Sequence, residues 1–231
     1  MLNYNKELNI HPSWNEFFTP LFKNGTIEKI LYNININSNG LTPSKQNIFK
    51  AFSIDLNEVK CVLIGEDPYP NPEYNNGIAY AVPKEDDSIA LNNFRDELYS
   101  TVDPNIQIDD IFDYSLKLWM DQGIMLINSA LTTAPFRTSS HWDYWKEFMK
   151  YFMNFMDSRD NILFCLLGDQ PNFLKKYVCN DKNKYFDCGT PHAYISKKRE
   201  FMNCDIFMVI DEHFFENHNY NFKWLLEREL V

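Results

Sequence analysis

Short apolar runs recur along the chain, and each one ends at a glycine or a polar residue. They span four to six residues, which suits a strand better than a helix. A continuous apolar run of this length is typical of a strand buried on both faces. We therefore predict strands over Lys60–Ile64, Ile124–Ile127, Ile162–Leu167 and Tyr185–Cys188.

Segments with apolar residues at helical spacing lie between these runs. Ser44 and Ser140 stand where a side chain can cap the start of a helix. We predict helices over Trp14–Phe22, Gln46–Phe52, Ala90–Tyr99, Ile111–Gln122, Trp142–Met156 and Asn172–Tyr177. The stretches Phe201–Phe207 and Trp224–Leu230 are expected to be helical or irregular and packed.

Strands that alternate with helices indicate an α/β protein with a mostly parallel sheet. We therefore expect a three-layer αβα fold around a central four-stranded sheet. No shift in composition, long linker, repeat or low-complexity tract divides the sequence. A single domain over residues 1–231 follows, with residues 1–40 packed on it as a helical or irregular N-terminal segment.

The predicted strands lead into Asp67, Asn128, Asp169 and His192. In open α/β sheets, ligands bind beyond the carboxyl ends of the strands, so these residues are expected in one pocket. The first of these turns reads G-E-D-P-Y-P over residues 65–70. Its glycine and two prolines impose a stiff turn, which suits a catalytic loop but also an ordinary acidic turn.

Composition and charge narrow the classes of function. Hydrophobic residues at 45% and aromatic residues at 16% indicate a packed globular protein. The net charge is −10, from 32 acidic and 22 basic residues, which disfavours binding to nucleic acid unless basic residues gather locally. One dense basic cluster exists, at Lys197, Lys198 and Arg199.

The five cysteines form no C-x-x-C pair and suit reduced core positions. The spacing of Cys179, Cys188 and His192 disfavours a zinc site, so we expect no metal and no cofactor. Residues 1–10 lack the apolar region of a signal peptide, and no apolar run has membrane-spanning length. We expect a cytoplasmic protein that is not embedded in a membrane.

Three blocks of sequence together resemble the family 1 uracil-DNA glycosylases. Residues 65–70 are similar to the family's G-Q-D-P-Y-H, and their final proline is similar to that of poxvirus members. Residues 119–128, W-M-D-Q-G-I-M-L-I-N, resemble W-A-x-Q-G-V-L-L-L-N. Residues 192–204 resemble H-P-S-P-L-S-x-x-R-G-F-F-G-C with one residue deleted. The resemblance implies hydrolysis of the N-glycosidic bond of deoxyuridine in DNA, as in base excision repair.

The resemblance also implies the catalytic groups. Asp67 would position the attacking water and stabilise the cationic sugar of the transition state. His192 would donate a hydrogen bond to uracil O2 as negative charge builds on the departing base. Glu66 replaces the family's glutamine, and its position would contribute a backbone N–H to the substrate.

Selection of the base would rest on three further residues. By resemblance, Asn128 would read O4 and N3 of uracil, because an amide offers both a donor and an acceptor. Tyr80 would stack on the base in place of the family's usual phenylalanine. Tyr69 would crowd the C5 position and so reject the methyl group of thymine.

DNA contacts are expected around a wedge that fills the stack when the nucleotide flips. Ile195 stands in the place of the family's intercalating leucine. Backbone contacts are expected from Ser88, Ser140, His141, Ser196, Lys197, Lys198 and Arg199. Single-stranded and double-stranded DNA containing uracil are the expected substrates, and a monomer is expected.

Departures from the family pattern leave rival interpretations open. The family's P-P-P-S loop corresponds here to the acidic Glu85–Ser88, and the loop around Ile195 has lost its prolines. One rival is a non-catalytic or weakly active DNA-binding or replication scaffold on the same fold. Another is a glycosylase for a different modified pyrimidine, motivated by Tyr80.

A protein inhibitor of uracil-DNA glycosylases and a replication partner are further expected partners. An unrelated hydrolase is disfavoured, since the chain has no G-x-S-x-G motif.

Overall fold

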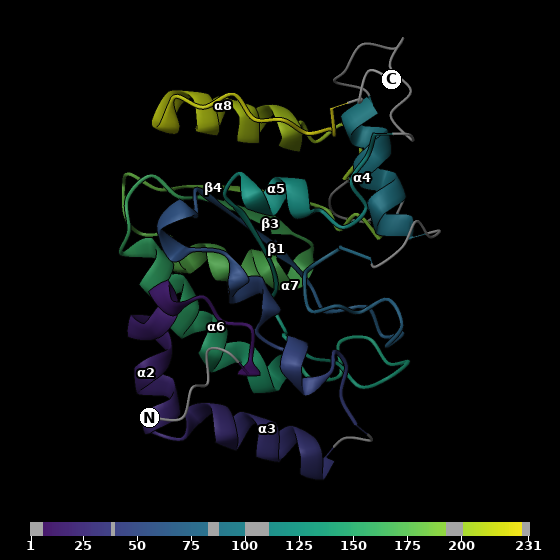
Figure 1. The fold of residues 1–231 in the computed structure, drawn as a ribbon, viewed down its shortest axis with the longest axis vertical. Helices are drawn as coiled ribbons and strands as arrows, with labels where there is room; N and C mark the ends of the chain where they lie inside the picture. The colour runs from purple at the N-terminus through teal and green to yellow at the C-terminus, as the bar shows by residue number, and fades with distance from the viewer. Residues whose placement is uncertain (1–6, 38–39, 83–87, 100–110, 193–200, 228–231) are drawn as a thin grey trace.

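A parallel four-stranded sheet forms the centre of the protein (Figure 1). The computed structural model describes residues 7–37, 40–82, 88–99, 111–192 and 201–227. The strand order is β2-β1-β3-β4, with parallel pairing throughout. The strands are β1 (Cys61–Gly65), β2 (Ile124–Asn128), β3 (Leu163–Leu167) and β4 (Lys184–Cys188), so the predicted strands are confirmed to within a residue or two.

Helices cover both faces of this sheet, which confirms the three-layer αβα prediction. Figure 1 shows α8 (Ile206–His218) on one side of the sheet and α6 (Trp142–Asp157) on the other. Every residue of β1, β2 and β3 is buried as a result. The remaining α-helices are α2 (Asn15–Lys23), α3 (Thr26–Asn37), α4 (Ile89–Tyr99), α5 (Lys117–Asp121) and α7 (Asp169–Asn172).

An aromatic cluster joins the N-terminal segment to α6. The 3₁₀ helix η1 (Pro12–Trp14) carries Trp14, whose ring meets that of Phe52 edge-on, with centroids 4.9 Å apart. Phe17 of α2 packs edge-on against Phe152 of α6 at 6.0 Å. The indole Nε1 of Trp14 donates to the carbonyl of Ile54 at 2.9 Å. Such ring pairs add about 0.5–1.5 kcal/mol each beyond burial, so they hold α2 against the core.

Some predicted helices are shorter or differently built. The segment 111–122 is helical only at α5, because the Asp113 carboxylate accepts from the N–H groups of Ser115 and Leu118 in a turn. The segment 46–52 forms two 3₁₀ turns, η2 (Lys45–Asn47) and η3 (Lys50–Ser53), in place of one α-helix. The segment 172–177 is the end of α7 followed by the 3₁₀ helix η6 (Phe173–Tyr177).

Ser140 does not cap α6, so that prediction is wrong. The N-cap residue of α6 is His141, and it makes no side-chain capping bond. The Ser140 hydroxyl instead accepts from the Ala134 N–H at 2.7 Å. The 3₁₀ helix η4 (Leu56–Glu58) comes just before β1, and it is capped by Asp55, whose carboxylate accepts from the Asn57 N–H at 3.0 Å.

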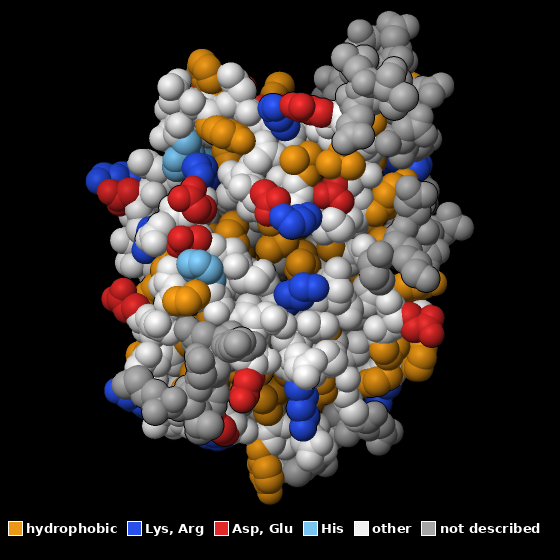
Figure 2. Space-filling model, in the orientation of Figure 1, with side chains coloured by type: hydrophobic (Ala, Val, Ile, Leu, Met, Phe, Trp, Pro, Cys, Tyr) orange, Lys and Arg blue, Asp and Glu red, His pale blue; other side chains and the backbone are white. Residues whose placement is uncertain are grey.

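Charges of both signs are interspersed on the surface. On the face shown in Figure 2, basic side chains of the described residues lie singly among acidic ones and apolar patches, with no continuous basic band. Among the described residues, no helix is long and apolar enough to cross a membrane.

Candidate active site

The strand register brings the predicted site residues to one edge of the sheet. Gly65, the last residue of β1, pairs with Asn128, the last residue of β2. The loop that carries Asp67 starts directly after Gly65, and β4 ends at Cys188, four residues before His192. Since parallel strands end on the same side, residues far apart in the sequence meet at the carboxyl edge.

Gly65 allows two polar side chains to approach the backbone of β1. A Cβ atom at this position would lie 2.6 Å from Oδ1 of Asn128 and 2.8 Å from Oη of Tyr80. Contacts this short mean that any side chain at residue 65 would displace Asn128 or Tyr80, so glycine is the residue that fits without a shift. The absence of a side chain at Gly65 therefore creates the space in which Asn128 and Tyr80 meet.

Asp67 is held by the backbone of a second loop. The N–H of Ser139 donates to Oδ2 of Asp67 at 2.6 Å. Burial raises the pKa of the Asp67 carboxyl above its ordinary value, and the hydrogen bond from Ser139 opposes that rise. The result is a fixed, partly desolvated carboxylate, which suits a group that stabilises a nearby positive charge.

The Glu66 side chain reaches the loop after β3. Its Oε1 accepts from the N–H of Asp169 at 3.1 Å, and its stem packs against Gly168, where a Cβ would come within 2.7 Å. Burial raises the pKa of the Glu66 carboxyl, opposed by the backbone N–H groups of Asp169 and Gln170. The extra charge is therefore bound by protein N–H groups.

Three rings line the site beside these carboxylates. The ring of His192 lies 5.7 Å from that of Tyr69 and 5.8 Å from that of Tyr80, measured between centroids. The Tyr69 hydroxyl donates to the Tyr80 carbonyl at 3.0 Å and lies 2.6 Å from Oγ of Ser88. Burial raises the pKa of Tyr69 to about 12, so this hydroxyl stays protonated.

Desolvation lowers the pKa of His192 from 6.5 to about 4. A lowered pKa leaves the imidazole neutral at pH 7, with one N–H to donate. The site thus combines a carboxylate, an amide and a neutral histidine.

The chain is similar to curated uracil-DNA glycosylases. The uracil-DNA glycosylase of Francisella tularensis subsp. tularensis (strain WY96-3418) is 30% identical over 189 residues, covering 80% of this chain and 84% of the relative. The chain belongs to the uracil-DNA glycosylase family. The uracil-DNA glycosylase of Francisella tularensis subsp. novicida (strain U112) is 29% identical over 195 residues, covering 82% of this chain and 86% of the relative. No protein-family model matches the chain.

Solved structures show the same fold for this uracil-DNA glycosylase family member. The crystal structure of mimivirus uracil-DNA glycosylase has a TM-score of 0.79 at 20% identity, covering 94% of this chain and 88% of the other. A mimivirus UNG variant in complex with UGI has a TM-score of 0.78 at 21% identity, covering 94% and 89%. These likenesses support the uracil-DNA glycosylase fold.

The predicted DNA contacts have different outcomes. His141 is only 1% exposed and its Nδ1 lies 3.0 Å from the Thr132 hydroxyl, so it is an interior group and not a surface contact as predicted. Ser88 and Ser140 are partly exposed, and their hydroxyls bond to neighbouring protein groups. A phosphate contact from either serine remains a prediction. Ile195, Ser196, Lys197, Lys198 and Arg199 lie outside the described residues.

Ser139 and Ser129 support the site but were not predicted from the sequence. Ser139 holds Asp67 through its backbone N–H at a positive φ of 55°, and its hydroxyl also helps to lower the pKa of the Asp67 carboxyl. Ser129 donates its hydroxyl to the Glu66 carbonyl at 2.5 Å, and its N–H donates to the Gly65 carbonyl at 2.8 Å. Both residues fix the loop that carries Asp67 by bonds to its backbone or carboxylate.

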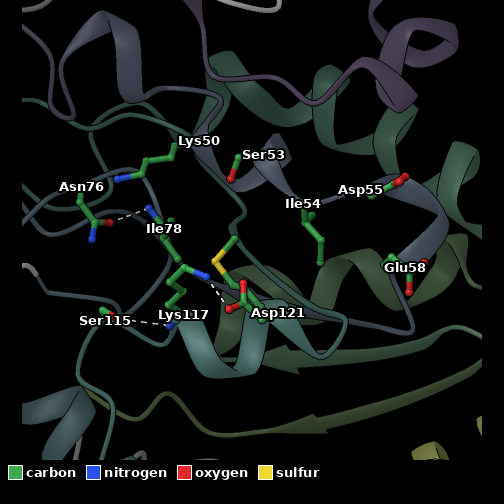
Figure 3. Close-up of a pocket in the computed structure, with 11 residues that line it drawn as sticks. Lys50, Ser53, Ile54, Asp55, Glu58, Asn76, Ile78, Ser115, Lys117 and Asp121 are labelled. Carbon is green, nitrogen blue, oxygen red and sulfur yellow. Dashed lines mark hydrogen bonds and ion pairs between the residues drawn. The ribbon is translucent and has the colours of Figure 1, made fainter.

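A cavity of about 550 Å³ lies away from these groups (Figure 3). It is bordered by the segment before β1, including Lys50, Ile54 and Glu58, and by Lys117 and Asp121 of α5, which form an ion pair. None of the predicted site residues lines it. Among the described residues, no group of three His, Cys, Asp or Glu side chains is placed to hold a metal ion.

Proposed function

We propose that this protein is a family 1 uracil-DNA glycosylase, which hydrolyses the N-glycosidic bond of deoxyuridine in DNA and leaves an abasic site. The observation that carries the proposal is the meeting of Asp67, Asn128 and His192 at the carboxyl edge of one sheet. Membership of the uracil-DNA glycosylase family supports it. The reaction is the first step of base excision repair.

The chemistry separates two developing charges. A nucleotide flipped out of the stack presents its sugar to Asp67 and its base to Asn128 and His192. As the bond from C1′ to N1 breaks, its electron pair moves onto the uracil, and C1′ gains positive charge. The Asp67 carboxylate stabilises that charge and orients the water that forms the new C1′–O bond; the proton of the water passes to Asp67 or to solvent.

His192 acts on the other charge. A neutral imidazole donates its N–H to uracil O2 and so stabilises the departing anion. The lowered pKa of His192 agrees with this role, because the ring is then neutral near pH 7. A single donor of this kind is worth about 2.7–4 kcal/mol in the transition state.

Recognition of the base rests on Asn128, Tyr69 and Tyr80. The Asn128 amide pairs with N3–H and O4 of uracil, Tyr80 stacks on the base, and Tyr69 stands near C5 against the thymine methyl. The hydrogen bonds that Tyr69 makes with Tyr80 and Ser88 keep its ring in place. A rigid ring rejects a methyl group more strongly than a mobile one, because the clash cannot relax.

DNA binding would place Ile195 in the stack, with Lys197, Lys198 and Arg199 beside the phosphates. Uracil in single strands is expected to be released faster, since no base pair is broken. If these basic residues grip DNA, the logarithm of the binding constant falls as the logarithm of salt concentration rises. A slope near zero in this relation would contradict phosphate contacts from these basic residues. A protein inhibitor and a replication partner are further proposed partners, and the protein is proposed to act as a monomer.

A uracil-containing oligonucleotide tests the function directly. Incubation followed by alkaline cleavage is expected to give a strand break at the uracil, and Asp67→Asn is the matched control. If no abasic product forms at high enzyme concentration, the glycosylase proposal is contradicted. Retained DNA binding without release of uracil would favour the scaffold interpretation.

A further inference from the structure

Tyr80 combines two energetic costs at one buried residue. It is 3% exposed, and its hydroxyl has no hydrogen-bond partner in the part of the chain that is described. Its φ of 66° also lies in the left-handed region, which a bulky side chain rarely adopts. Both features lower the stability of the free protein, and strained or unpaired groups of this kind gather at functional sites.

The unpaired hydroxyl faces a second unpaired group. Asn128 is 8% exposed, and its side-chain amide makes no hydrogen bond with any described residue. Both Oη of Tyr80 and Oδ1 of Asn128 lie within 3 Å of the point where a Cβ of residue 65 would stand. Because Gly65 has no side chain, no Cβ atom occupies that point, and both oxygens border the same space.

The edge of the bound base decides which orientation of the Asn128 amide is useful. Uracil offers an N3–H donor and an O4 acceptor, so it needs Oδ1 toward N3 and Nδ2 toward O4. Cytosine offers the opposite pair and would need the amide turned over. An amide that is free to turn would therefore discriminate poorly between the two bases.

We propose that the Tyr80 hydroxyl is a positioning group that donates to Oδ1 of Asn128 in the substrate complex and fixes the amide for the uracil edge. This inference rests on the proposed function and adds a determinant of base selectivity to it. In the reversed orientation, Nδ2 would donate to the phenol oxygen, and the phenol proton would be left without an acceptor in a buried space. The uracil orientation therefore satisfies more groups.

Removal of one oxygen atom tests the inference. Tyr80→Phe keeps the ring and its packing against Phe94, whose centroid lies 5.0 Å away. The variant is expected to release uracil about three- to tenfold more slowly in kcat/KM, since it loses one net hydrogen bond. It is also expected to lose uracil-over-cytosine selectivity by a similar factor. Loss of an unpaired buried hydroxyl should raise the midpoint of thermal unfolding by about 2–4 °C.

A double-mutant cycle separates positioning from direct contact. In an Asn128→Ala background, Tyr80→Phe is expected to change kcat/KM by less than about twofold, because the group that the hydroxyl positions is gone. An undiminished effect in that background would show that the hydroxyl acts without Asn128 and would overturn the inference. A lowered unfolding midpoint in Tyr80→Phe would also overturn it, because the hydroxyl would then be paired in the free protein.

The same measurements distinguish this inference from the proposed function. Uracil released equally by the wild type and by Tyr80→Phe, with unchanged selectivity, would overturn the inference alone. A folded wild-type protein that releases no uracil would overturn the proposed function, and the inference with it.

Discussion

At the amino end of the sheet, buried polar groups are paired with one another. Oδ1 of Asn183 accepts from the Ile162 N–H at 2.8 Å, and its Nδ2 donates to Oδ1 of Asp157 at 3.0 Å. The other carboxylate oxygen of Asp157 accepts from the N–H groups of Cys179 and Asn180 at 2.8 and 3.0 Å. This network ties the end of α6 to the start of β3 and β4.

At the carboxyl end, the side chains of Tyr80, Asn128 and His192 make no hydrogen bonds with other described residues. Tyr80 and Asn128 are buried, and desolvation lowers the pKa of His192, so each of these side chains would gain from a hydrogen-bond partner. Folding alone would not maintain such an arrangement, since each unpaired buried group costs free energy. This comparison indicates that the amino end of the sheet stabilises the fold, whereas the carboxyl end is organised for a ligand.

The test with the largest expected effect replaces a carboxylate with an amide at each end of the sheet. Asp67→Asn is expected to slow uracil release by about 100- to 1000-fold, because it removes the charge opposite the cationic sugar. Its free energy of unfolding should not fall, since burial already disfavours the charged form. Single-turnover release of uracil and urea unfolding measure the two effects.

Asp157→Asn is the matched control for that exchange. It should lower the free energy of unfolding by about 1–3 kcal/mol, through the loss of paired acceptors, and leave uracil release by the folded protein unchanged. Equal effects of Asp67→Asn and Asp157→Asn on stability would contradict the difference between the two ends.

A second test removes an asparagine from each end. Asn183→Ala should lower the free energy of unfolding by about 2–4 kcal/mol, because the Ile162 N–H and the Asp157 carboxylate lose a buried partner. Asn128→Ala should cost little stability and most of the activity. Chemical denaturation of both variants measures these stabilities. A stability loss confined to Asn128→Ala would show that the carboxyl end, and not the amino end, stabilises the fold.

The positions of the polar residues at the edge of the sheet could be predicted from the sequence. The hydrogen bonds that these residues make could not. The apolar runs predicted the strands, and the parallel topology then placed Asp67 and Asn128 at one edge. The bond from Ser139 to Asp67 and the turn of Glu66 toward Asp169 depend on backbone N–H groups, which every residue type except proline has. Residue types alone therefore carried no signal for them.

Two helices lie in stretches expected to be helical or irregular, and their bounds were not predicted, for physical reasons. In α3, Ile27, Ile30 and Ile34 form the buried stripe, but the alternation of Asn and Ile near its end imitates a strand. In α8, apolar residues lie on the exposed side as well as the buried side, with Met208 50% and Phe215 61% exposed. The helical period was therefore obscured.

A third test uses a histidine of the amino end. His213 is 3% exposed, its Nε2 lies 3.1 Å from the Lys60 carbonyl, and burial, with the nearby His218, lowers its pKa from 6.5 to about 4. A lowered folded-state pKa gives stability that is present above pH 6.5 and lost as the pH falls toward 4. The difference in unfolding free energy between wild type and His213→Gln should shrink by about 2–3 kcal/mol over that window.

The His213→Gln comparison isolates one histidine from its surroundings. His218 and Lys184 lie near this ring, and the raised pKa values of Glu66 and Asp67 change stability in the opposite direction, so wild-type data alone are insufficient. Unfolding in urea at pH 7 and pH 4.5 gives the required difference. If the difference in unfolding free energy between wild type and His213→Gln does not change with pH, the lowered pKa of His213 is contradicted.

The smallest expected effect concerns the space at Gly65. Gly65→Ala would press a methyl group against Asn128 and Tyr80 and cost about 1–3 kcal/mol of stability by overpacking. Uracil release should fall about tenfold if the displaced groups lose 1.4 kcal/mol of transition-state binding. Gly25→Ala controls for the clash alone, because no atom lies within 4 Å of its Cβ position; any stability it loses comes from its positive φ of 73°, which disfavours a side chain. Thermal unfolding and kcat/KM of both variants check the comparison.

The position of β1 in the sheet has a consequence for biosynthesis. β1 is the earliest strand in the chain and pairs with both β2 and β3, so the sheet extends outward from it as later strands emerge. His192 follows β4, the last of the four strands in chain order. Such long-range pairing is slow because chain closure must precede the contacts that reward it. Recovery of uracil release during refolding would therefore report completion of the entire sheet, later than any signal from the β1–β2 pair.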